Sequence, residues 1–141
     1  MTRVELPPRF DAGAIEAKWQ AEWARQQAFR ALDEPKGRRF SLILPPPNVT
    51  GVLHMGHMLG DTVMDALARV HRMRGEAVLW VPGVDHAGLS TQTAVRRSLS
   101  KEGVRLENLP REEVLRHVEA WKAERETHIR RQLVAGGFSI D

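Results

Sequence analysis

Apolar positions in the middle of the chain follow two different periods, and together they predict a strand–helix–strand unit. Residues 40–44 form one apolar run, and residues 77–81 form a second, continuous run that is typical of a strand covered on both faces. Between them, a helical pattern begins at residue 53 or 54 and ends near residue 73, before Gly75. Four apolar residues recur in this pattern at helical spacing, and we expect them to face inward: Leu59, Val63, Leu67 and Val70.

The same kind of periodicity predicts three more helices. The first spans residues 11–28 behind Asp11, which is a suitable N-cap. It carries an apolar stripe that we expect to anchor it to the rest of the protein: Ile15, Trp19 and Trp23. Another helix spans residues 90–101 and stops at Gly103. A long helix begins around Pro110 and closes at residues 136–137, with apolar residues in an approximately helical period: Val114, Val118, Trp121, Ile129 and Leu133.

The order of elements predicts an α/β fold with a parallel strand pair, because strand–helix–strand crossovers are right-handed and leave the two strands parallel. The loops at residues 45–51 and 82–88 then leave from the same carboxyl edge of the sheet. Ligands of open α/β folds bind outside that edge. We therefore expect the two loops to face one another across a single pocket.

Composition narrows the class of protein without specifying its function. The 141 residues are enough for one domain, and 42% hydrophobic with 28% charged residues is ordinary for a globular protein. No apolar run approaches the roughly 20 residues of a membrane span, and residues 1–8 contain no signal-peptide core. The absence of cysteine is typical of a reducing compartment. These features predict a cytoplasmic protein that does not bind membranes.

Arginine is frequent, but the formal net charge is only +3. Two interpretations remain open for the arginines on the predicted helices. They form solvated helix faces with glutamate partners, or they form a footprint for nucleic acid. Charge alone does not separate them.

The segment at residues 45–57 carries the main candidate chemistry, because an apolar strand leads through a proline-rich loop into a helix that opens on His54, Gly56 and His57. Helix N-termini present free N–H groups and a partial positive charge, which suit a phosphate. The histidines are three residues apart, so both can point at one anion. The same spacing also occurs in half of a metal site and in pairs of surface histidines. Since there is no cysteine and no third ligand nearby, we predict no protein-bound metal.

Three segments resemble the N-terminal part of bacterial-type valyl-tRNA synthetases, which are class I aminoacyl-tRNA synthetases. They are Pro-Pro-Pro-Asn-Val-Thr-Gly-x-Leu-His-Met-Gly-His at residues 45–57, Arg-Met-Arg-Gly at 72–75 and Pro-Gly-x-Asp-His-Ala-Gly-x-x-Thr-Gln at 82–92. The resemblance covers essentially the whole chain. The Asp-His-Ala-Gly-x-x-Thr-Gln element separates valyl enzymes from their isoleucyl and leucyl relatives.

The resemblance implies a Rossmann-like catalytic domain that activates valine with ATP and transfers it to tRNA(Val). It identifies His54, Met55, Gly56 and His57 as the HIGH signature, which binds ATP. The two histidines would stabilise charge that develops as pyrophosphate leaves, and Gly56 would leave room for the adenosine. Mg²⁺ would be carried in by ATP.

The resemblance also implies an amino-acid site. Asp85 would bind the ammonium group of valine, with a helix cap as the alternative role of an aspartate at this position. Pro46 and Asn48 would shape the valine pocket. His86 and Gln92 are further candidates for adenylate contacts. Val84 departs from the family, which has threonine there, so a hydroxyl near Asp85 is missing.

Other parts of the family pattern do not occur in the sequence, including the Lys-Met-Ser-Lys-Ser loop that clamps the ATP phosphates. We therefore expect one incomplete Rossmann-like domain over residues 1–141, with a helical extension at 1–36 and the HIGH half at 37–141. Such a chain should be weakly active or inactive alone, and should self-associate or dock to the missing half. It could also be part of a longer enzyme. The alternative is a non-catalytic binding module for a nucleotide, tRNA or a partner protein.

Overall fold

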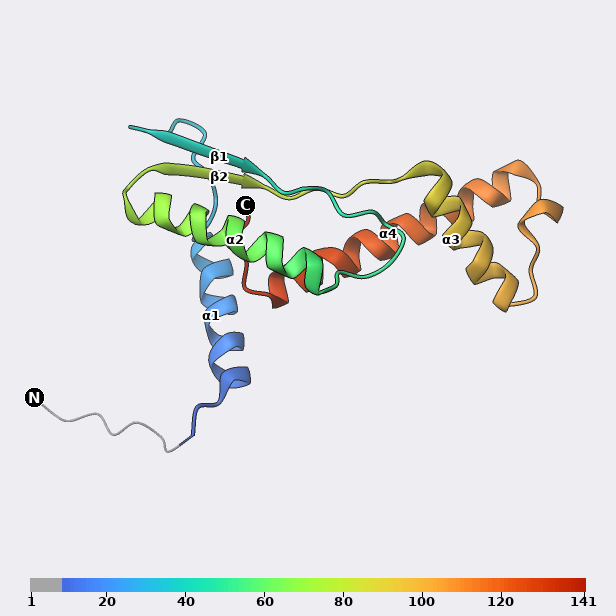
Figure 1. Cartoon of the computed structure of the whole chain (residues 1–141), viewed down its shortest axis with the longest axis horizontal. Helices are drawn as coiled ribbons and strands as arrows, with labels where there is room; N and C mark the ends of the chain where they lie inside the picture. The colour runs from blue at the N-terminus through green and yellow to red at the C-terminus, as the bar shows by residue number, and fades with distance from the viewer. Residues whose placement is uncertain (1–8) are drawn as a thin grey trace, which may run out of the picture.

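The computed structural model describes residues 9–141, so the expectation for residues 1–8 lies outside the described residues. Figure 1 shows an elongated molecule with the two strands towards one end and α3 at the other. No helix within residues 9–141 has both the length and the apolar character of a membrane span. The elements are α1 (Ala12–Gln26), β1 (Arg39–Ile43), α2 (Met55–Met73), β2 (Ala77–Val81), α3 (Gly88–Lys101), the 3-10 helix η1 (Leu106–Asn108) and α4 (Arg111–Ala135).

The predicted strand–helix–strand unit is confirmed. β1 and β2 pair in parallel, with Phe40 opposite Val78 and Leu42 opposite Trp80. These four residues share one face of the sheet and pack in the main core with Met64 and Ala68 of α2. Trp80 is fully buried there, so the sheet is held to α2 by apolar contacts.

The expectation that β2 is covered on both faces is wrong. Val78 and Trp80 are buried, but Leu79 and Val81 between and after them are exposed. Ile43 of β1 is exposed on the same side, with 75% of its surface accessible. Successive strand residues point to opposite faces, and within residues 9–141 only one face of this sheet is packed in a core.

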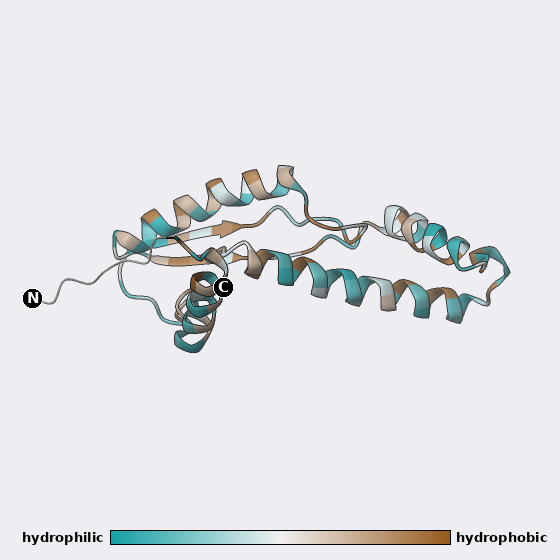
Figure 2. Cartoon of the chain, turned by 90° about the horizontal axis from the view of Figure 1, so that it is seen from below, coloured by the Kyte–Doolittle hydropathy of each residue, from teal (hydrophilic) through white to brown (hydrophobic). Residues whose placement is uncertain are grey.

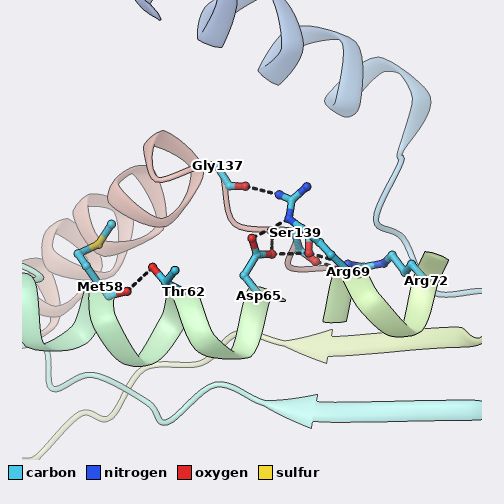
Figure 3. A network of polar contacts seen from close by, with 7 residues as sticks. All are labelled: Met58, Thr62, Asp65, Arg69, Arg72, Gly137 and Ser139. Atoms are coloured by element: carbon cyan, nitrogen blue, oxygen red, sulfur yellow. Dashed lines mark hydrogen bonds and ion pairs between the residues drawn. The ribbon is translucent and has the colours of Figure 1, made fainter. Parts of the chain in front are cut away.

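The inward-facing stripe predicted for α2 is also wrong, because its four residues are exposed by 41–70%: Leu59, Val63, Leu67 and Val70. The helix instead buries the side that carries Met64 and Ala68. The adjoining polar residues Asp65, Arg69 and Arg72 contact the C-terminal segment, which lies along α2 (Figure 3). Polar side chains are tolerated at an interface when each finds a partner.

The partners on the C-terminal segment are mostly backbone groups. Asp65 accepts hydrogen bonds from the backbone N–H of Ser139 at 2.8 Å and from the Arg69 guanidinium at 2.7 Å. Arg72 donates to the Ser139 carbonyl, and Arg69 donates to the Gly137 carbonyl, each at 2.8 Å. This network fixes residues 137–139 against α2.

A second, smaller core joins α3, η1 and the first half of α4, with Val95, Leu99 and Leu106 buried. α4 belongs to both cores, because Ile129 and Leu133 lie in the main one. Figure 2 shows α4 as largely hydrophilic along its length, whereas the strands are hydrophobic. The predictions for α3 and α4 are confirmed within about two residues.

The first helix is confirmed, with Asp11 accepting a hydrogen bond from Ala14 as its N-cap. Its expected apolar anchor is only partly formed. Trp23 is half-buried and packs near Phe29 and Arg69, while Ile15 and Trp19 remain exposed. α1 projects from the side of the molecule in Figure 1.

Candidate active site at the start of helix α2

The two histidines of the His-x-Gly-His segment form a reciprocal cap at the start of α2. His54 is the N-cap residue with extended backbone, and its Nδ1 accepts a hydrogen bond from the Gly56 N–H at 3.1 Å. The Nδ1 of His57 accepts from the His54 N–H at 3.2 Å. His54 therefore precedes the helix, whereas the sequence suggested that both histidines lie on it. The cap satisfies two N–H groups that a helix start leaves free.

This cap also fixes the direction of both rings. Since each Nδ1 faces the backbone, each Nε2 points away from it. The ring centroids are 4.0 Å apart, and both residues line an open hollow of about 520 Å³ with residues 45–48 and 50–52. The arrangement places two imidazole rings at one space beside a helix N-terminus, which suits an anion.

Gly56 lies close to the His54 ring, a contact that the sequence did not reveal. A Cβ at this position would lie 3.0 Å from Cε1 and 3.1 Å from Nδ1 of His54. These are tight contacts, so a side chain at residue 56 would require the His54 ring to shift by a few tenths of an ångström. The glycine thus leaves room for the ring at its observed position.

Asp61 is a buried carboxylate near His57 that the sequence reasoning missed. It lies one turn after His57 on α2 and is only 7% exposed. Burial raises the pKa of Asp61, and the nearby His57 partly opposes that rise. The four-residue spacing from His57 was the signal that could have identified it.

The two loops at the carboxyl edge of the sheet are brought together as predicted, but they do not face each other across a pocket. Asn48 and Asp85 form a parallel bridge. The Val49 N–H donates to the Asp85 carbonyl at 3.0 Å, and the Asp85 N–H donates to the Pro47 carbonyl at 2.9 Å. Direct backbone pairing therefore extends the sheet where we expected a gap.

Asp85 stabilises the turn before α3. Its Oδ1 accepts a hydrogen bond from the Ala87 N–H at 2.8 Å. Ala87 has a φ of 39°, a left-handed conformation that is unfavourable for a residue with a Cβ. One oxygen of the Asp85 carboxylate therefore has the local capping role that we considered as the alternative. The other oxygen has no hydrogen-bond partner within residues 9–141, and the side chain is exposed.

The remaining candidates differ in their placement. Pro46 lines the hollow beside the histidines, and Asn48 lines both this hollow and a second one against α3. His86 and Gln92 are exposed, and they line neither the hollow beside the histidines nor the one against α3. Val84 is half-buried against the main core. Its missing hydroxyl leaves the Asp85–Ala87 hydrogen bond intact.

Two side chains of α4 contact the loop that carries the candidate residues. The indole Nε1 of Trp121 donates to the Val49 carbonyl at 2.8 Å. The Gln132 side chain accepts from the Leu53 N–H at 2.9 Å. Sequence reasoning assigned Trp121 only to an apolar stripe and did not consider Gln132, because no local pattern indicates partners so far away in the chain.

Several arginines of the helices have the glutamate partners that the solvated-face interpretation requires. Arg96 pairs with Glu107, Arg130 with Glu126 and Arg116 with Glu113, at 2.9, 3.1 and 3.2 Å. As for metals, within residues 9–141 no three His, Asp or Glu side chains gather into a potential site.

Comparison with known proteins identifies the family of this chain. Residues 18–141 match the family described as tRNA synthetases class I (I, L, M and V). A valine--tRNA ligase of Synechocystis sp. is 44% identical over 136 residues, which is 96% of this chain and 15% of that protein. The mitochondrial valine--tRNA ligase of Homo sapiens is 48% identical over 142 residues, 96% of this chain and 13% of that protein.

A solved structure supports the fold. The LeuRS–tRNA–LeuAMS ternary complex from Agrobacterium radiobacter K84 superposes with a TM-score of 0.76 over 94% of this chain and 15% of that chain, at 23% identity. The chain thus spans only a small part of the length of these proteins. Because the family match covers most of its residues, the chain belongs to the class I tRNA synthetases.

Proposed function

We propose that this chain is the ATP- and valine-binding half of a valyl-tRNA synthetase active site. The observation that carries the proposal is the reciprocal histidine cap, which holds the imidazoles of His54 and His57 beside one hollow at the start of a 19-residue helix. The identity to valine--tRNA ligases supports valine as the amino acid.

In this proposal, the histidines bind the phosphates of ATP through their Nε2 atoms, beside the N-terminal turn at Met55 and Gly56. The carboxylate of valine attacks the α-phosphorus, and the bond to the departing pyrophosphate breaks. Negative charge grows on the pyrophosphate oxygens, where fixed N–H donors stabilise it most. ATP would bring Mg²⁺ with it.

The amino-acid side of the site is proposed to lie at the paired loops. The free oxygen of Asp85 would bind the ammonium group of valine, since a charge-assisted hydrogen bond is strong where water is partly displaced. Pro46 and Asn48 would border the side chain of valine, and His86 and Gln92 would contact the adenylate. Transfer to tRNA(Val) is proposed for the longer proteins, and the isolated chain would have weak or no aminoacylation activity.

Valine-dependent exchange of pyrophosphate into ATP tests this function. Asp85→Asn is a suitable variant, because its amide oxygen can still accept from the Ala87 N–H while the charge is lost. We expect exchange by the wild type and loss of exchange in Asp85→Asn without a change in melting temperature. Salt-dependent tRNA binding with no response to ATP or valine would contradict the proposal and favour the non-catalytic module.

A further inference from the structure

We propose that Trp121 and Gln132 of α4 are positioning residues that hold the signature loop in its binding geometry. The inference rests on the proposed function, because it concerns the same loop. Neither side chain lines the hollow at the histidines. They would act through the backbone of Val49 and Leu53.

Trp121 satisfies a carbonyl that water cannot reach. Val49 is fully buried, and its carbonyl accepts the hydrogen bond from the Trp121 indole. A buried carbonyl without a partner is costly, so this bond fixes the loop at Val49. By contrast, the indole N–H of Trp80 is also buried but has no partner within residues 9–141.

Trp121 is itself held in place from two sides. Its ring packs against the core of α3 and η1, and the Arg125 guanidinium lies over it at 4.3 Å from the centroid. Movement of the Val49 carbonyl would therefore require movement of a packed aromatic ring. This couples the second core of the protein to the loop.

Gln132 holds the other end of the same loop segment. Its side-chain oxygen accepts from the Leu53 N–H at 2.9 Å, and its side-chain nitrogen lies 3.5 Å from the Leu53 carbonyl. Leu53 is buried and directly precedes His54. Gln132 thus sets the point from which the cap of α2 begins.

Helical periodicity allows Trp121 and Gln132 to hold the same loop together. Trp121 and Gln132 are 11 residues apart in α4, about three turns, so they project from nearly the same side. They bracket residues 49–53, a segment without regular secondary structure. On its other side, the Asn48–Asp85 bridge holds the loop. A helix that is anchored in both cores therefore defines where Asn48 and His54 lie.

Conservative variants separate positioning from stability. Trp121→Phe keeps an aromatic ring and removes the donor, with Trp19→Phe on exposed α1 as its control. Gln132→Leu removes both contacts, and Gln132→Glu keeps the accepting oxygen. We expect ATP with Mg²⁺ to bind about tenfold more weakly to Trp121→Phe and Gln132→Leu, on the scale of one hydrogen bond. Gln132→Glu should restore most of the affinity, and Trp19→Phe should bind like the wild type.

Amide exchange at Gly56 provides a readout that needs no ligand, because this N–H is bonded to His54. We expect faster exchange at Gly56 in Trp121→Phe and Gln132→Leu at temperatures where both variants remain folded. Unchanged exchange together with wild-type affinity, and only a lower melting temperature, would overturn the inference. A wild type that binds no ATP would refute the proposed function, while Gly56 exchange would still decide the positioning role.

Discussion

His54 and His57 together cap the start of α2, and their ring centroids are 4.0 Å apart. The Nδ1 of His54 accepts from the Gly56 N–H, and the Nδ1 of His57 accepts from the His54 N–H. The relationship gives one pair of residues two roles. The Nδ1 atoms cap the first turn of α2, and the Nε2 atoms remain available for a ligand. Any test of ligand binding must therefore preserve the cap while it removes the imidazoles.

Asp61 should make the protein less stable as the pH rises. Burial raises the pKa of Asp61 above the ordinary value of about 3.9, so the folded state favours the protonated form. Its unfavourable contribution begins above about pH 3.9 and is complete once the pH exceeds the raised pKa. Asp61→Asn should therefore melt at a higher temperature than the wild type near neutral pH.

The difference in melting temperature between Asp61→Asn and the wild type should disappear in acid. As a control, Asp33→Asn at an exposed position should not raise the melting temperature comparably at neutral pH. Thermal melts over a pH series measure the melting temperatures of both variants. A less stable Asp61→Asn at neutral pH would show that the ionised carboxylate is needed for folding.

Glu76 should have the opposite pH dependence. Its Oε2 lies 2.6 Å from Nδ1 of His71, which stacks on Phe40. The hydrogen bond with His71 lowers the pKa of Glu76, and Arg38 adds to this effect. The stabilisation is present above the unfolded value of about 4.3 and is lost as the pH falls through the depressed pKa. Glu76→Gln should be less stable near neutral pH and should converge with the wild type in acid; a constant difference at all pH values would contradict this.

The Asp65 network should contribute strongly to stability. Asp65→Ala leaves the Ser139 N–H, the Ser139 hydroxyl and the Arg69 guanidinium without their shared acceptor, which should lower the free energy of unfolding by about 2–4 kcal/mol. The matched control is Glu126→Ala, which breaks a surface pair with Arg130 and should cost under about 1 kcal/mol. Urea unfolding measures both. Equal effects would mean that the C-terminal segment is held mainly by apolar contacts.

The uncovered sheet face should cause the 141-residue chain to self-associate. Ile43, Leu79 and Val81 are exposed on this face, and contiguous apolar surface favours association. Ile43→Lys should reduce association in sedimentation velocity, whereas Val134→Lys on α4 should not. A wild type that is a monodisperse monomer and binds no hydrophobic dye would contradict this prediction.

Local sequence patterns were sufficient for the elements and their order, but not for which sides of them are buried. The outward stripe of α2 from Leu59 to Val70 shows the limit. Its apolar period marks a helix, yet the buried side carries Met64 and Ala68. Next to them lie Asp65 and Arg72, whose partner Ser139 is far along the chain. Only the three-dimensional path of α4 reveals that Trp121 reaches Val49.

The candidate site, too, was only partly predictable from local sequence patterns. The histidine spacing and the crossover rule were sufficient to bring His54, His57 and the two loops to one edge of the sheet. The direct pairing of Asn48 with Asp85 was not predictable, because handedness fixes the edge and not the distance between loops.

Calorimetric titration of ATP and Mg²⁺ into cap-preserving variants tests the central claim most directly. His54→Asn retains a good N-cap, and His57→Gln retains the side-chain acceptor of a capping box, while each removes an imidazole Nε2. We predict that the wild type binds ATP and that both variants lose about tenfold or more in affinity with little change in melting temperature. Wild-type affinity in both variants would show that these histidines serve only to cap α2.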